Sequence, residues 1–309
     1  MSRWTIAACL MSLPTMSEKL PILYCLQMHP EGRTQAMELA SLMADIEPGP
    51  QTKMGFMFCL CRGCVMDTGV EMKIRAKFPD TRIYKCQHSV AGWPKGPNAT
   101  IHEVYSMFSR QCNTERPDRW QYAAIMMGEP DCVPLTKDWI SRIWTEWHEC
   151  NWNWPGGNRQ LVLGYWLAPG DSDCGFPHIN GNCLLSPEFI RRYPTFTQTT
   201  FGAWDTTHSR ALMQYGRPSK EIFSDYNIGG TDPRKPWPGC QALFKPRVLH
   251  GPFPILNERI NPCYLHGVKD QRGIGCVRTA LNINPPSRDR FTIQPSKDFR
   301  GIQKIPLDN

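Results

Sequence analysis

The sequence predicts an α/β protein with a mostly parallel central sheet flanked by helices, in a single domain with a loop-rich C-terminal part. Apolar runs of strand length alternate with segments of helical periodicity, and short connections separate them. The 28 Pro and 24 Gly among 309 residues are spread along the whole chain, which argues against a helical bundle. Apolar residues make up 41% of the chain, enough for a substantial core, and charged residues only 20%, too few for a disordered polyelectrolyte.

The N-terminal part carries the pattern of a βαβ unit. Residues 21–27 form an apolar run of strand length, and residues 34–46 repeat apolar side chains at helical spacing. The Pro-Gly-Pro sequence at 48–50 ends the expected helix, and a second apolar run covers residues 55–61. A strand, a helix and a strand joined by short loops predict two parallel strands of one sheet.

The alternation continues through the middle of the chain. We expect a helix at about residues 100–108 with Asn98 as its N-cap, and a short helix with Ser186 as N-cap and Pro187 in its first turn. The other expected elements are strands at residues 82–85, 122–127 and 160–167 and a helix at 136–149.

The two ends of the chain lack this pattern. Residues 1–19 hold only a short apolar patch without a clear cleavage site, and we expect an N-terminal extension there. Pro and Gly become dense after residue 230, and clear periodicity is lost after His266. The predicted domain therefore covers residues 20–282, followed by an extended tail at 283–309.

Net charge, cysteine content and hydropathy indicate which partners, which redox state and which location the protein has. The net charge of +7 suits a polyanionic partner or a phosphate-bearing small substrate, and equally a plain soluble protein. The 14 Cys do not fall in evenly spaced sets, and Cys25 and Cys59 lie inside apolar runs, which predicts buried, reduced thiols. No run reaches the roughly 18 apolar residues of a membrane span, so we expect a cytoplasmic protein without membrane contact.

Two carboxylates follow the strand expected at residues 122–127. Glu129 and Asp131 are two residues apart, so in an extended chain their side chains point the same way. Open parallel sheets bind ligands beyond the carboxyl ends of their strands, and a hard divalent cation takes carboxylate and phosphate oxygens as ligands. The spacing therefore indicates a metal–diphosphate site; the alternative is a strand-end turn whose acids are simply solvated.

A second group of suitable side chains lies far downstream, in the sequence His266-Gly267-Val268-Lys269. His266 offers a metal ligand, Gly267 permits close approach of the backbone, and Lys269 offers a point charge for a phosphate. The alternative is a surface loop with an ordinary histidine.

Together these motifs resemble those of nucleotide-sugar glycosyltransferases of the GT-A fold, over about residues 20 to 270. Glu129-Pro-Asp131 is similar to the DxD-type motif of that family, with Glu in the first place, and His266 and Lys269 are similar to its C-terminal metal and diphosphate contacts. Within the family, the chain resembles the glycosyltransferases associated with TET/JBP-type pyrimidine hydroxylases, a group that includes the base J glucosyltransferase type and phage relatives.

The resemblance implies a UDP-sugar donor, with UDP-glucose expected, and a Mn²⁺ or Mg²⁺ ion that joins the diphosphate to Asp131 and His266. Lys269 would stabilise the charge on the leaving UDP, and Asp205 would be the catalytic base of an inverting transfer. The further donor-binding residues that the resemblance implies are His29, Arg33, Trp93, Gly96, Asn98, Glu129, Asn180 and Asn182.

The acceptor that the resemblance implies is the hydroxyl of a 5-hydroxymethylpyrimidine in DNA, a base that would leave the stack to reach the donor. The positive net charge and the pairs Arg191-Arg192 and Arg234-Lys235 suit contacts with DNA phosphates. A protein or glycan acceptor stays open, and so does a protein that binds nucleotide sugars without turning them over.

A cysteine cluster supports a different hypothesis. Cys59, Cys61 and Cys64 lie in a C-x-C-x-x-C sequence, and Cys86 and His88 follow them along the chain. These side chains offer the ligands of a zinc site, and part of the chain would then be a nucleic-acid-binding module. Tightly retained stoichiometric zinc would support that module, whereas exchangeable Mn²⁺ needed only for activity would support the transferase.

Overall fold

The computed structural model describes most of the chain between residues 20 and 283, in the ranges 20–114, 120–150, 161–167, 176–193, 202–225, 239–249, 258–269 and 272–283. The extension expected at residues 1–19 lies outside these ranges, and so does the expected tail beyond Ile283. Among the described residues, no helix is both long and apolar enough to cross a membrane.

The parallel half of the central sheet consists of β1 (Ile22–Met28), β2 (Met54–Leu60), β3 (Thr81–Lys85) and β4 (Ala124–Gly128). β1 pairs in parallel with β2 on one side and with β4 on the other, and β3 lies beyond β2. Every residue of β1 and β2 is buried, as continuous apolar runs covered on both faces require. The predicted βαβ unit is therefore confirmed, with α1 (Arg33–Ile46) as its crossover helix.

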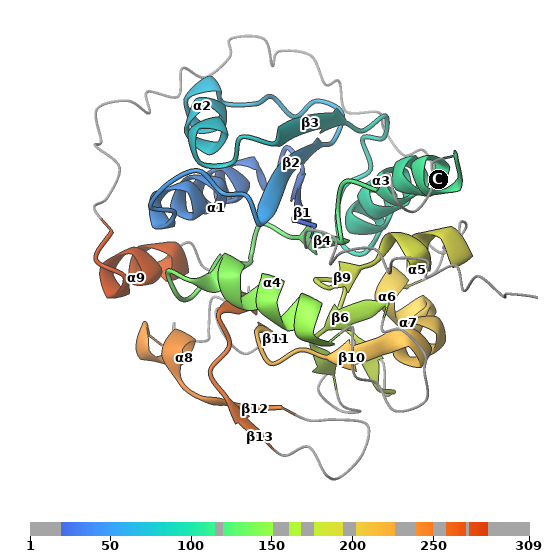
Figure 1. Cartoon of the computed structure of the whole chain (residues 1–309). Helices are drawn as coiled ribbons and strands as arrows, with labels where there is room; N and C mark the ends of the chain where they lie inside the picture. Colours follow the sequence, from blue (N-terminus) through green and yellow to red (C-terminus); the bar gives the residue numbers. More distant parts are fainter. Residues whose placement is uncertain are drawn as a thin grey trace, which may run out of the picture.

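Three further strands extend the sheet on the side of β4. β9 (Leu184–Leu185) pairs antiparallel with β4 and with β6 (Val162–Gly164), and β10 (Gly216–Pro218) pairs in parallel with β6. The resulting seven-stranded order is β10-β6-β9-β4-β1-β2-β3 (Figure 1). The mostly parallel central sheet that the sequence predicts is thus confirmed, with β9 as the antiparallel strand.

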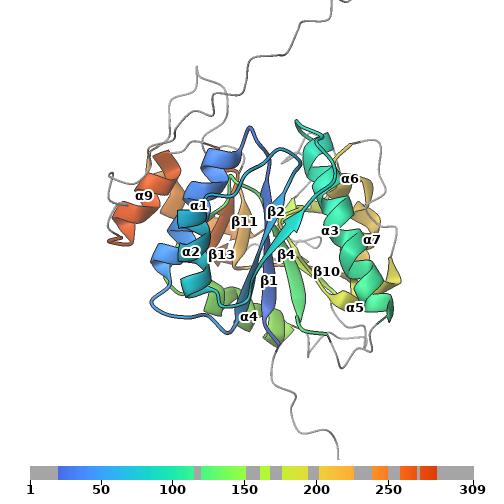
Figure 2. The ribbon, with the colours of Figure 1, turned by 90° about the horizontal axis from the view of Figure 1, so that it is seen from above.

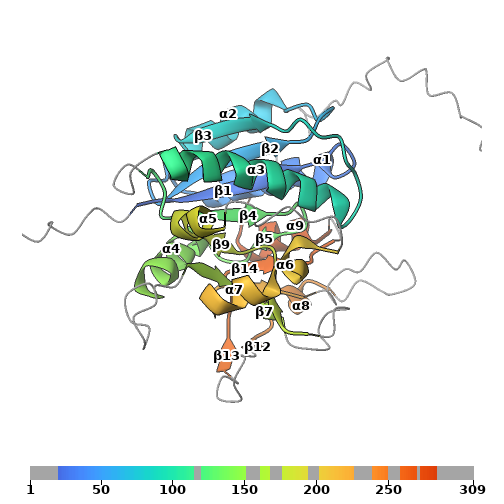
Figure 3. The ribbon, with the colours of Figure 1, turned by 90° about the vertical axis from the view of Figure 1, so that its right-hand side faces the viewer.

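Helices cover both faces of this sheet. Figure 2 shows α1 and α2 (Thr68–Lys77) on one side of β1, β2 and β4, and α3 (Lys95–Thr114) on the other. α5 (Pro187–Arg192) and α7 (Ser209–Tyr215) lie on the same side as α3, which runs across the face of the sheet in Figure 3. Flanking helices therefore bury both faces, as the fold class requires.

Successive residues of β1 contribute to two separate cores. Tyr24 and Leu26 pack in the core on the α1 side, whereas Leu23 and Cys25 pack in the core on the α3 side. The period of two is that of an extended strand with both faces buried. Cys25 is a free, fully buried thiol, as predicted.

The helix on the α3 side is longer than predicted. α3 begins at Lys95, not near residue 100, so Asn98 lies inside its first turn and is not the N-cap. The sequence Gly96-Pro97 has the composition of a loop, but a proline is tolerated in the first turn of a helix because its missing N–H has no partner there.

Among the helices that were not predicted, α2 and α9 have weak sequence signals of different kinds. α2 buries only Val70 and Ile74, and its start is stabilised by Asp67, whose carboxylate accepts a hydrogen bond from Val70 N at 2.9 Å. α9 (Arg272–Ala280) contains two glycines, which lower helix propensity. It lies after His266, where the sequence predicted no regular element.

Several other elements begin or end at different residues from those predicted, and β4 begins at Ala124 where the strand was expected from residue 122. The strand expected at 160–167 is divided into β6 and β7 (Trp166–Leu167), and β7 pairs with β8 (His178–Ile179). The helix expected at 136–149 is α4 (Trp139–Cys150). Between β6 and β7 the carbonyl of Tyr165 accepts a hydrogen bond from Asn180 N at 2.9 Å, so the chain leaves the central sheet there.

The cap of α5 agrees with the prediction and can be tested. Ser186 Oγ accepts a hydrogen bond from Phe189 N at 3.0 Å, and Pro187 occupies the first turn. We expect Ser186→Ala to lower the free energy of unfolding by about 1 kcal/mol, because one buried N–H of the first turn loses its acceptor. Urea denaturation measures the change. Ser106→Ala, at a half-buried position within α3, is the control and should cause no loss, because alanine has the higher helix propensity; an equal loss in both variants would contradict a capping role.

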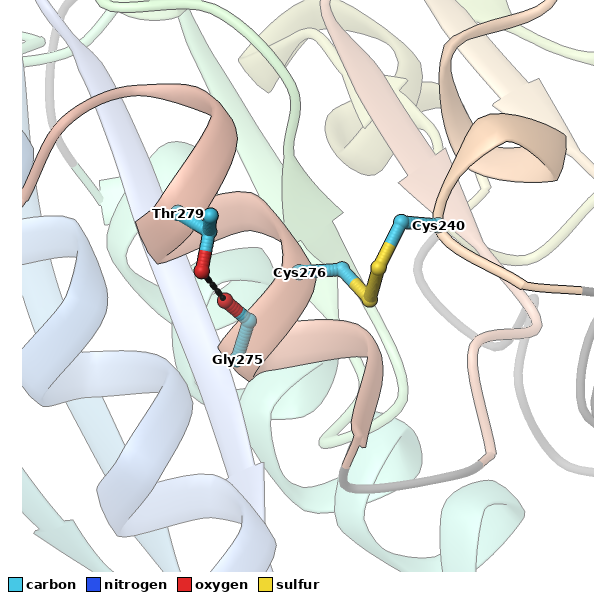
Figure 4. Close-up of a disulfide and its surroundings, with 4 residues drawn as sticks. All are labelled: Cys240, Gly275, Cys276 and Thr279. Carbon is cyan, nitrogen blue, oxygen red and sulfur yellow. Dashed lines mark hydrogen bonds between the residues drawn. A yellow bond between two sulfur atoms is a disulfide. The ribbon is translucent and has the colours of Figure 1, made fainter.

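A disulfide joins two segments of the C-terminal part. Cys240, directly before α8 (Gln241–Phe244), is bonded to Cys276 in α9 (Figure 4). This pair departs from the general expectation of reduced thiols, which rested on cysteines within apolar runs such as Cys59. A short antiparallel pair, β12 (Arg247–Leu249) with β13 (Glu258–Ile260), follows α8.

Candidate active site

The site begins where β4 ends. A Cβ on Gly128 would lie 2.1 Å from Tyr24 Oη, so only glycine fits between the strand and this buried ring. The next residues form a tight turn, in which Cys132 N donates to Glu129 O at 3.1 Å. The two acids therefore leave the sheet at the carboxyl end of a central strand, where α/β sheets place their ligands.

A small second sheet brings the downstream histidine to this turn. β5 (Val133–Pro134) pairs antiparallel with β14 (Tyr264–His266), and β11 (Ile222–Ser224) pairs in parallel with β14 on its other side. The register sets Leu265 opposite Val133, and Val268 N donates to Asp131 O at 2.8 Å. Two motifs far apart in the sequence are thereby held against each other by main-chain hydrogen bonds.

The three side chains of this acid–histidine cluster, Glu129, Asp131 and His266, converge. His266 Nε2 lies 3.3 Å from Asp131 Oδ1 and 3.5 Å from Glu129 Oε2, and one donor atom from each residue lies within 4.8 Å of the others. Ser224 Oγ is 3.1 Å from His266 Nδ1, so the ring is oriented with Nε2 toward the acids. The structure therefore places Glu129, predicted to bind the donor, beside the two residues predicted as metal ligands.

The two carboxylates of the cluster stabilise a positive charge on His266. Burial alone would lower the pKa of His266, but the charges and hydrogen bonds of Asp131 and Glu129 outweigh it and raise the pKa to about 10. Burial would likewise raise the pKa of Asp131, and the cations His266 and Lys269 hold it below its usual range. Lys269, an exposed side chain, thus acts on the cluster through space.

The donor set fits a divalent cation. Among the residues that the structure describes, the buried Asp131 Oδ1 has only the 3.3 Å approach of His266 Nε2 and no hydrogen bond of good geometry, so one of its lone pairs is left for another ligand. Two carboxylates and an imidazole suit Mn²⁺, and Mg²⁺ with its preference for oxygen, when phosphate or water completes the coordination. A bound divalent cation would take the place of the proton on His266.

A network of buried amides connects the cluster to the loop after β8. Asn182 Oδ1 accepts hydrogen bonds from Glu129 N and from Cys132 Sγ, both at 3.1 Å. Asn180 Oδ1 in turn accepts from Asn182 N at 3.0 Å. Both asparagines, predicted to bind the donor, are almost fully buried, and their side-chain oxygens hold the protein's own backbone. They therefore position the acid-bearing turn, and direct contact with a sugar stays a prediction.

Asp205, the predicted base, lies at the other end of this network. It belongs to α6 (Trp204–Thr207), and its carboxylate accepts hydrogen bonds from Gly181 N at 2.8 Å and Thr206 N at 2.9 Å. Burial raises its pKa, as does the charge of Glu129, against the opposing effect of His178. A carboxylate with a raised pKa is a stronger base than an exposed one, as proton abstraction requires.

The segment predicted to face the nucleotide is tied to α6. Asn98 Nδ2 donates to Gly202 O at 2.8 Å, and Asn98 Oδ1 accepts from Trp204 N at 3.0 Å. Gly96 is buried in the first turn of α3, and Trp93, 75% exposed, stands on the surface just before it. Asn98 therefore joins α3 to the segment that carries the predicted base, while a contact of the exposed Trp93 with a base or sugar stays a prediction.

His29 and Arg33 follow β1 but are directed elsewhere. Arg33 Nε donates to Val65 O at 2.6 Å, and His29 Nδ1 accepts from Glu31 N at 3.4 Å. The loop itself approaches the site, because a Cβ on Gly32 would lie 3.6 Å from the ring of Pro130. The structure thus brings the backbone of their loop to the acid-bearing turn, and a contact of either side chain with the donor stays a prediction.

Two residues that position the site were not predicted from the sequence. Ser224 orients His266, and Gln35 Nε2 in α1 donates to Val268 O at 3.2 Å. An isolated serine in a short strand and a polar residue on a helix carry no motif. The register of β11 against β14 decides the role of Ser224, and the packing of α1 decides that of Gln35, so no local pattern encodes either.

No known protein-family model and no curated protein sequence matches this chain. Among solved structures, an active-site mutant of LgtC is 11% identical over 86% of this chain and 98% of LgtC, with a TM-score of 0.47. Staphylococcus aureus TarS 1-349 in complex with UDP is 10% identical over 65% of this chain and 57% of TarS 1-349 (TM-score 0.43). The mannosyltransferase PcManGT from Pyrobaculum calidifontis, with GDP-Man and Mn²⁺, is 10% identical over 65% of this chain and 55% of its own (TM-score 0.39).

The chain spans only part of most of these relatives, 58% of one TarS 1-349 chain and 35% of a longer TarS chain. Identities of 10–11% and TM-scores below 0.5 mean that the similarity of the backbones is distant. The function is therefore inferred from the site itself.

Proposed function

We propose that this protein is a metal-dependent glycosyltransferase that moves a hexose from a UDP-sugar to a hydroxyl acceptor. The observation that carries the proposal is the convergence of Glu129, Asp131 and His266 at the carboxyl end of β4. A half-buried pair of carboxylates with an oriented, buried imidazole, next to an exposed lysine, suits a cation and a diphosphate. The nature of the nucleotide and of the sugar rests on the resemblance of the motifs.

Each side chain then has a separate task. Glu129, Asp131 and His266 would hold Mn²⁺ or Mg²⁺, which when bound supplies positive charge to the diphosphate leaving group. Lys269 is exposed beside Asp131 and adds a point charge on the same side. Asp205 would hold the proton that the acceptor hydroxyl loses, as an inverting transfer requires.

Hydrogen bonds from the neighbouring asparagines and backbone amides hold these groups in fixed positions. Asn182 binds the backbone of Glu129, Asn180 binds Asn182, and Asp205 binds the backbone of Gly181 between the two. The metal ligands and the proposed base are thus parts of one hydrogen-bonded unit. Such pre-organisation removes the cost of arranging the groups during the reaction.

A 5-hydroxymethylpyrimidine in DNA is the proposed acceptor, supported by the net charge of +7. Arg191 and Arg192, predicted to meet DNA phosphates, both pair with Glu188, at 2.8 and 2.9 Å. Their charge is thereby partly offset, so phosphate contacts would come from other cations. The pair at 234–235 lies outside the described residues.

A panel of donors and acceptors tests the proposal. UDP-glucose, UDP-galactose, UDP-N-acetylglucosamine and GDP-mannose are each incubated with Mn²⁺ and with duplexes that contain 5-hydroxymethyluracil or 5-hydroxymethylcytosine. We expect UDP release with UDP-glucose and a hexose mass on the modified nucleoside. Unmodified duplexes of the same sequence are the control.

The outcomes separate the parts of the proposal. Metal-dependent UDP release that does not respond to modified DNA would retain the transferase and reject the DNA acceptor. Absence of release with every donor, together with binding of UDP and Mn²⁺, would leave a nucleotide-sugar binder. Absence of both binding and release would refute the proposed function.

A further inference from the structure

We propose a second metal site, for a thiophilic divalent cation such as Zn²⁺, formed by Cys61, Cys86 and His88 at the ends of β2 and β3. The site has other ligands and other chemistry than the acid–histidine cluster. Its existence does not depend on the proposed transferase activity.

The sheet register brings the two cysteines together. β2 and β3 are parallel neighbours with Leu60 opposite Lys85, and Cys61 and Cys86 are the residues that follow these two. Cys86 N donates to Leu60 O at 2.8 Å, which continues the ladder by one step. Adjacent parallel strands lie about 4.8 Å apart, so the two thiols start from neighbouring backbone positions.

The loop after β3 then returns His88 to the same place. Arg62 N donates to His88 O at 2.8 Å, which ties the two strand-end loops to each other. Glu103 of α3 accepts a hydrogen bond from His88 N at 2.9 Å and so anchors this loop on the helix. His88 is thereby held at the corner of two strands and a helix.

The side-chain geometry is close to that of a metal-binding site. Cys61 Sγ lies 3.8 Å from His88 Nε2, and one donor atom from each of Cys61, Cys86 and His88 lies within 4.8 Å of the others. Ligands of a tetrahedral zinc ion are separated by roughly 3.5–3.8 Å, as bond lengths near 2.3 Å to sulfur and 2.1 Å to nitrogen require. Only small movements would therefore close the three donors around an ion.

Burial and the neighbouring polar groups favour the same interpretation. Cys61 and Cys86 are 3% and 4% exposed, whereas His88 is half-buried, so the donors are shielded but open on one side. Thr100 of α3, 1% exposed, lies 3.3 Å from Cys61 Sγ and 3.1 Å from His88 Nε2. Within the described part of the chain, the buried His88 Nδ1 has no hydrogen-bond partner. Cys61, His88 and Thr100 therefore form one largely buried polar cluster, with His88 Nε2 turned toward the thiol.

The chemistry of the donors selects the ion. Two sulfurs and an imidazole form a soft set that prefers Zn²⁺ over Mg²⁺ or Mn²⁺, the reverse of the oxygen-rich acid–histidine cluster. Three protein ligands leave a fourth coordination position for water or another small ligand. Thiolates would therefore hold Zn²⁺ more tightly at Cys61 and Cys86, and Mn²⁺ or Mg²⁺ would find better ligands in the acid–histidine cluster.

The structure also corrects the zinc hypothesis drawn from the C-x-C-x-x-C sequence. Cys59 packs in the core on the α3 side, and Cys64 packs against the opposite core, so neither belongs to the group of converging donors. Cys61 alone of the three takes part. Because its partners are strand ends of the central sheet, the site joins β2, β3 and α3 and forms no separate nucleic-acid-binding module.

Zinc retention and cobalt spectroscopy on the full chain test the proposal. Metal-free protein, prepared under reduction with a thiol-free reductant, is titrated with Zn²⁺ against a chromophoric chelator and separately with Co²⁺. We expect one tightly bound Zn²⁺ per chain and a Co²⁺ spectrum with thiolate-to-metal charge transfer. Cys61→Ser and Cys86→Ser should each abolish stoichiometric binding, with folding checked by circular dichroism.

Two control variants make the result specific. Cys64→Ser removes a half-buried thiol of the same loop, and Asp131→Asn alters the acid–histidine cluster; both should retain the Zn²⁺ and the cobalt spectrum. Loss of binding in Cys64→Ser to the same extent as in Cys61→Ser would overturn the assignment. So would a wild-type chain that binds no Zn²⁺, or a Co²⁺ spectrum without thiolate bands, and these two readouts do not depend on any variant.

Discussion

Asp131→Asn is expected to abolish metal-dependent turnover. The carboxylate of Asp131 lies 3.3 Å from His266 Nε2, closer than that of Glu129 at 3.5 Å, and its Oδ1 is buried, so it is the acid most deeply set in the proposed metal site. An amide of the same shape removes the negative charge that a divalent cation needs. We expect UDP release to fall by about 10²- to 10³-fold and Mn²⁺ binding to weaken in parallel.

Stability and metal binding must be measured together for this variant. Removal of one partner from a buried ion pair leaves the other charge uncompensated. Here Glu129 remains 3.5 Å from His266 Nε2, so His266 keeps one acidic partner and the fold should persist. Calorimetry or electron paramagnetic resonance reports Mn²⁺ binding, and circular dichroism reports folding.

The matched control is Asp138→Asn, an exposed acid further along the same segment. It carries the same chemical change outside the cluster, and its rate and Mn²⁺ affinity should equal those of the wild type. If Asp131→Asn bound Mn²⁺ as tightly as Asp138→Asn, the assignment of Asp131 as a ligand would be wrong.

Gly128→Ala is expected to have the largest effect on stability. The added Cβ would lie 2.1 Å from Oη and 2.3 Å from Cζ of Tyr24, a ring with no exposed surface. Tyr24 cannot move freely, because its hydroxyl is 2.7 Å from that of Tyr264 and its ring contacts Trp139. Overpacking of this kind lowers the free energy of unfolding by about 3 kcal/mol.

Urea denaturation gives the magnitude, with Gly49→Ala as the matched control. A Cβ on Gly49 meets no atom within 4 Å, so that variant should unfold near the wild-type midpoint. Because Gly128 directly precedes Glu129, a displaced strand end should also weaken Mn²⁺ binding. Equal urea midpoints for the two alanine variants would show that the Tyr24 ring moves aside without loss of stability, and would contradict the tight packing around it.

The elements that the sequence predicted well are those whose pattern is local. β1, α1 and β2 have apolar runs or stripes because each is buried along much or all of its length, and their bounds agree with the predicted ones to about one residue. The cap of α5 was predictable because Ser186 and Phe189 are close neighbours in the sequence. α2 and α9 were missed because few apolar residues, or two glycines, obscure the helical period.

The chemistry of the site was likewise predictable in part. A strand followed by Glu129 and Asp131, with His266 and Lys269 downstream, specified the kinds of ligand available. The N-cap prediction for Asn98 was wrong because α3 begins at Lys95. The hydrogen bonds that Asn98 and Asn182 make to distant segments could not be predicted, since those segments meet only in the folded chain. The zinc hypothesis from the sequence also included Cys59 and Cys64. The sequence could not show that these two side chains pack against opposite cores, away from Cys61.

By itself, the sequence determined the α/β alternation and the inventory of reactive groups, because strand and helix periods and side-chain chemistry are properties of short segments. Only the tertiary structure decided which groups meet. The pairing of β5 with β14 sets His266 beside Asp131, and the pairing of β2 with β3 sets Cys61 beside Cys86. The physical reason is that strand register depends on contacts between segments distant in sequence, and a shift of one residue would turn these side chains to the opposite face.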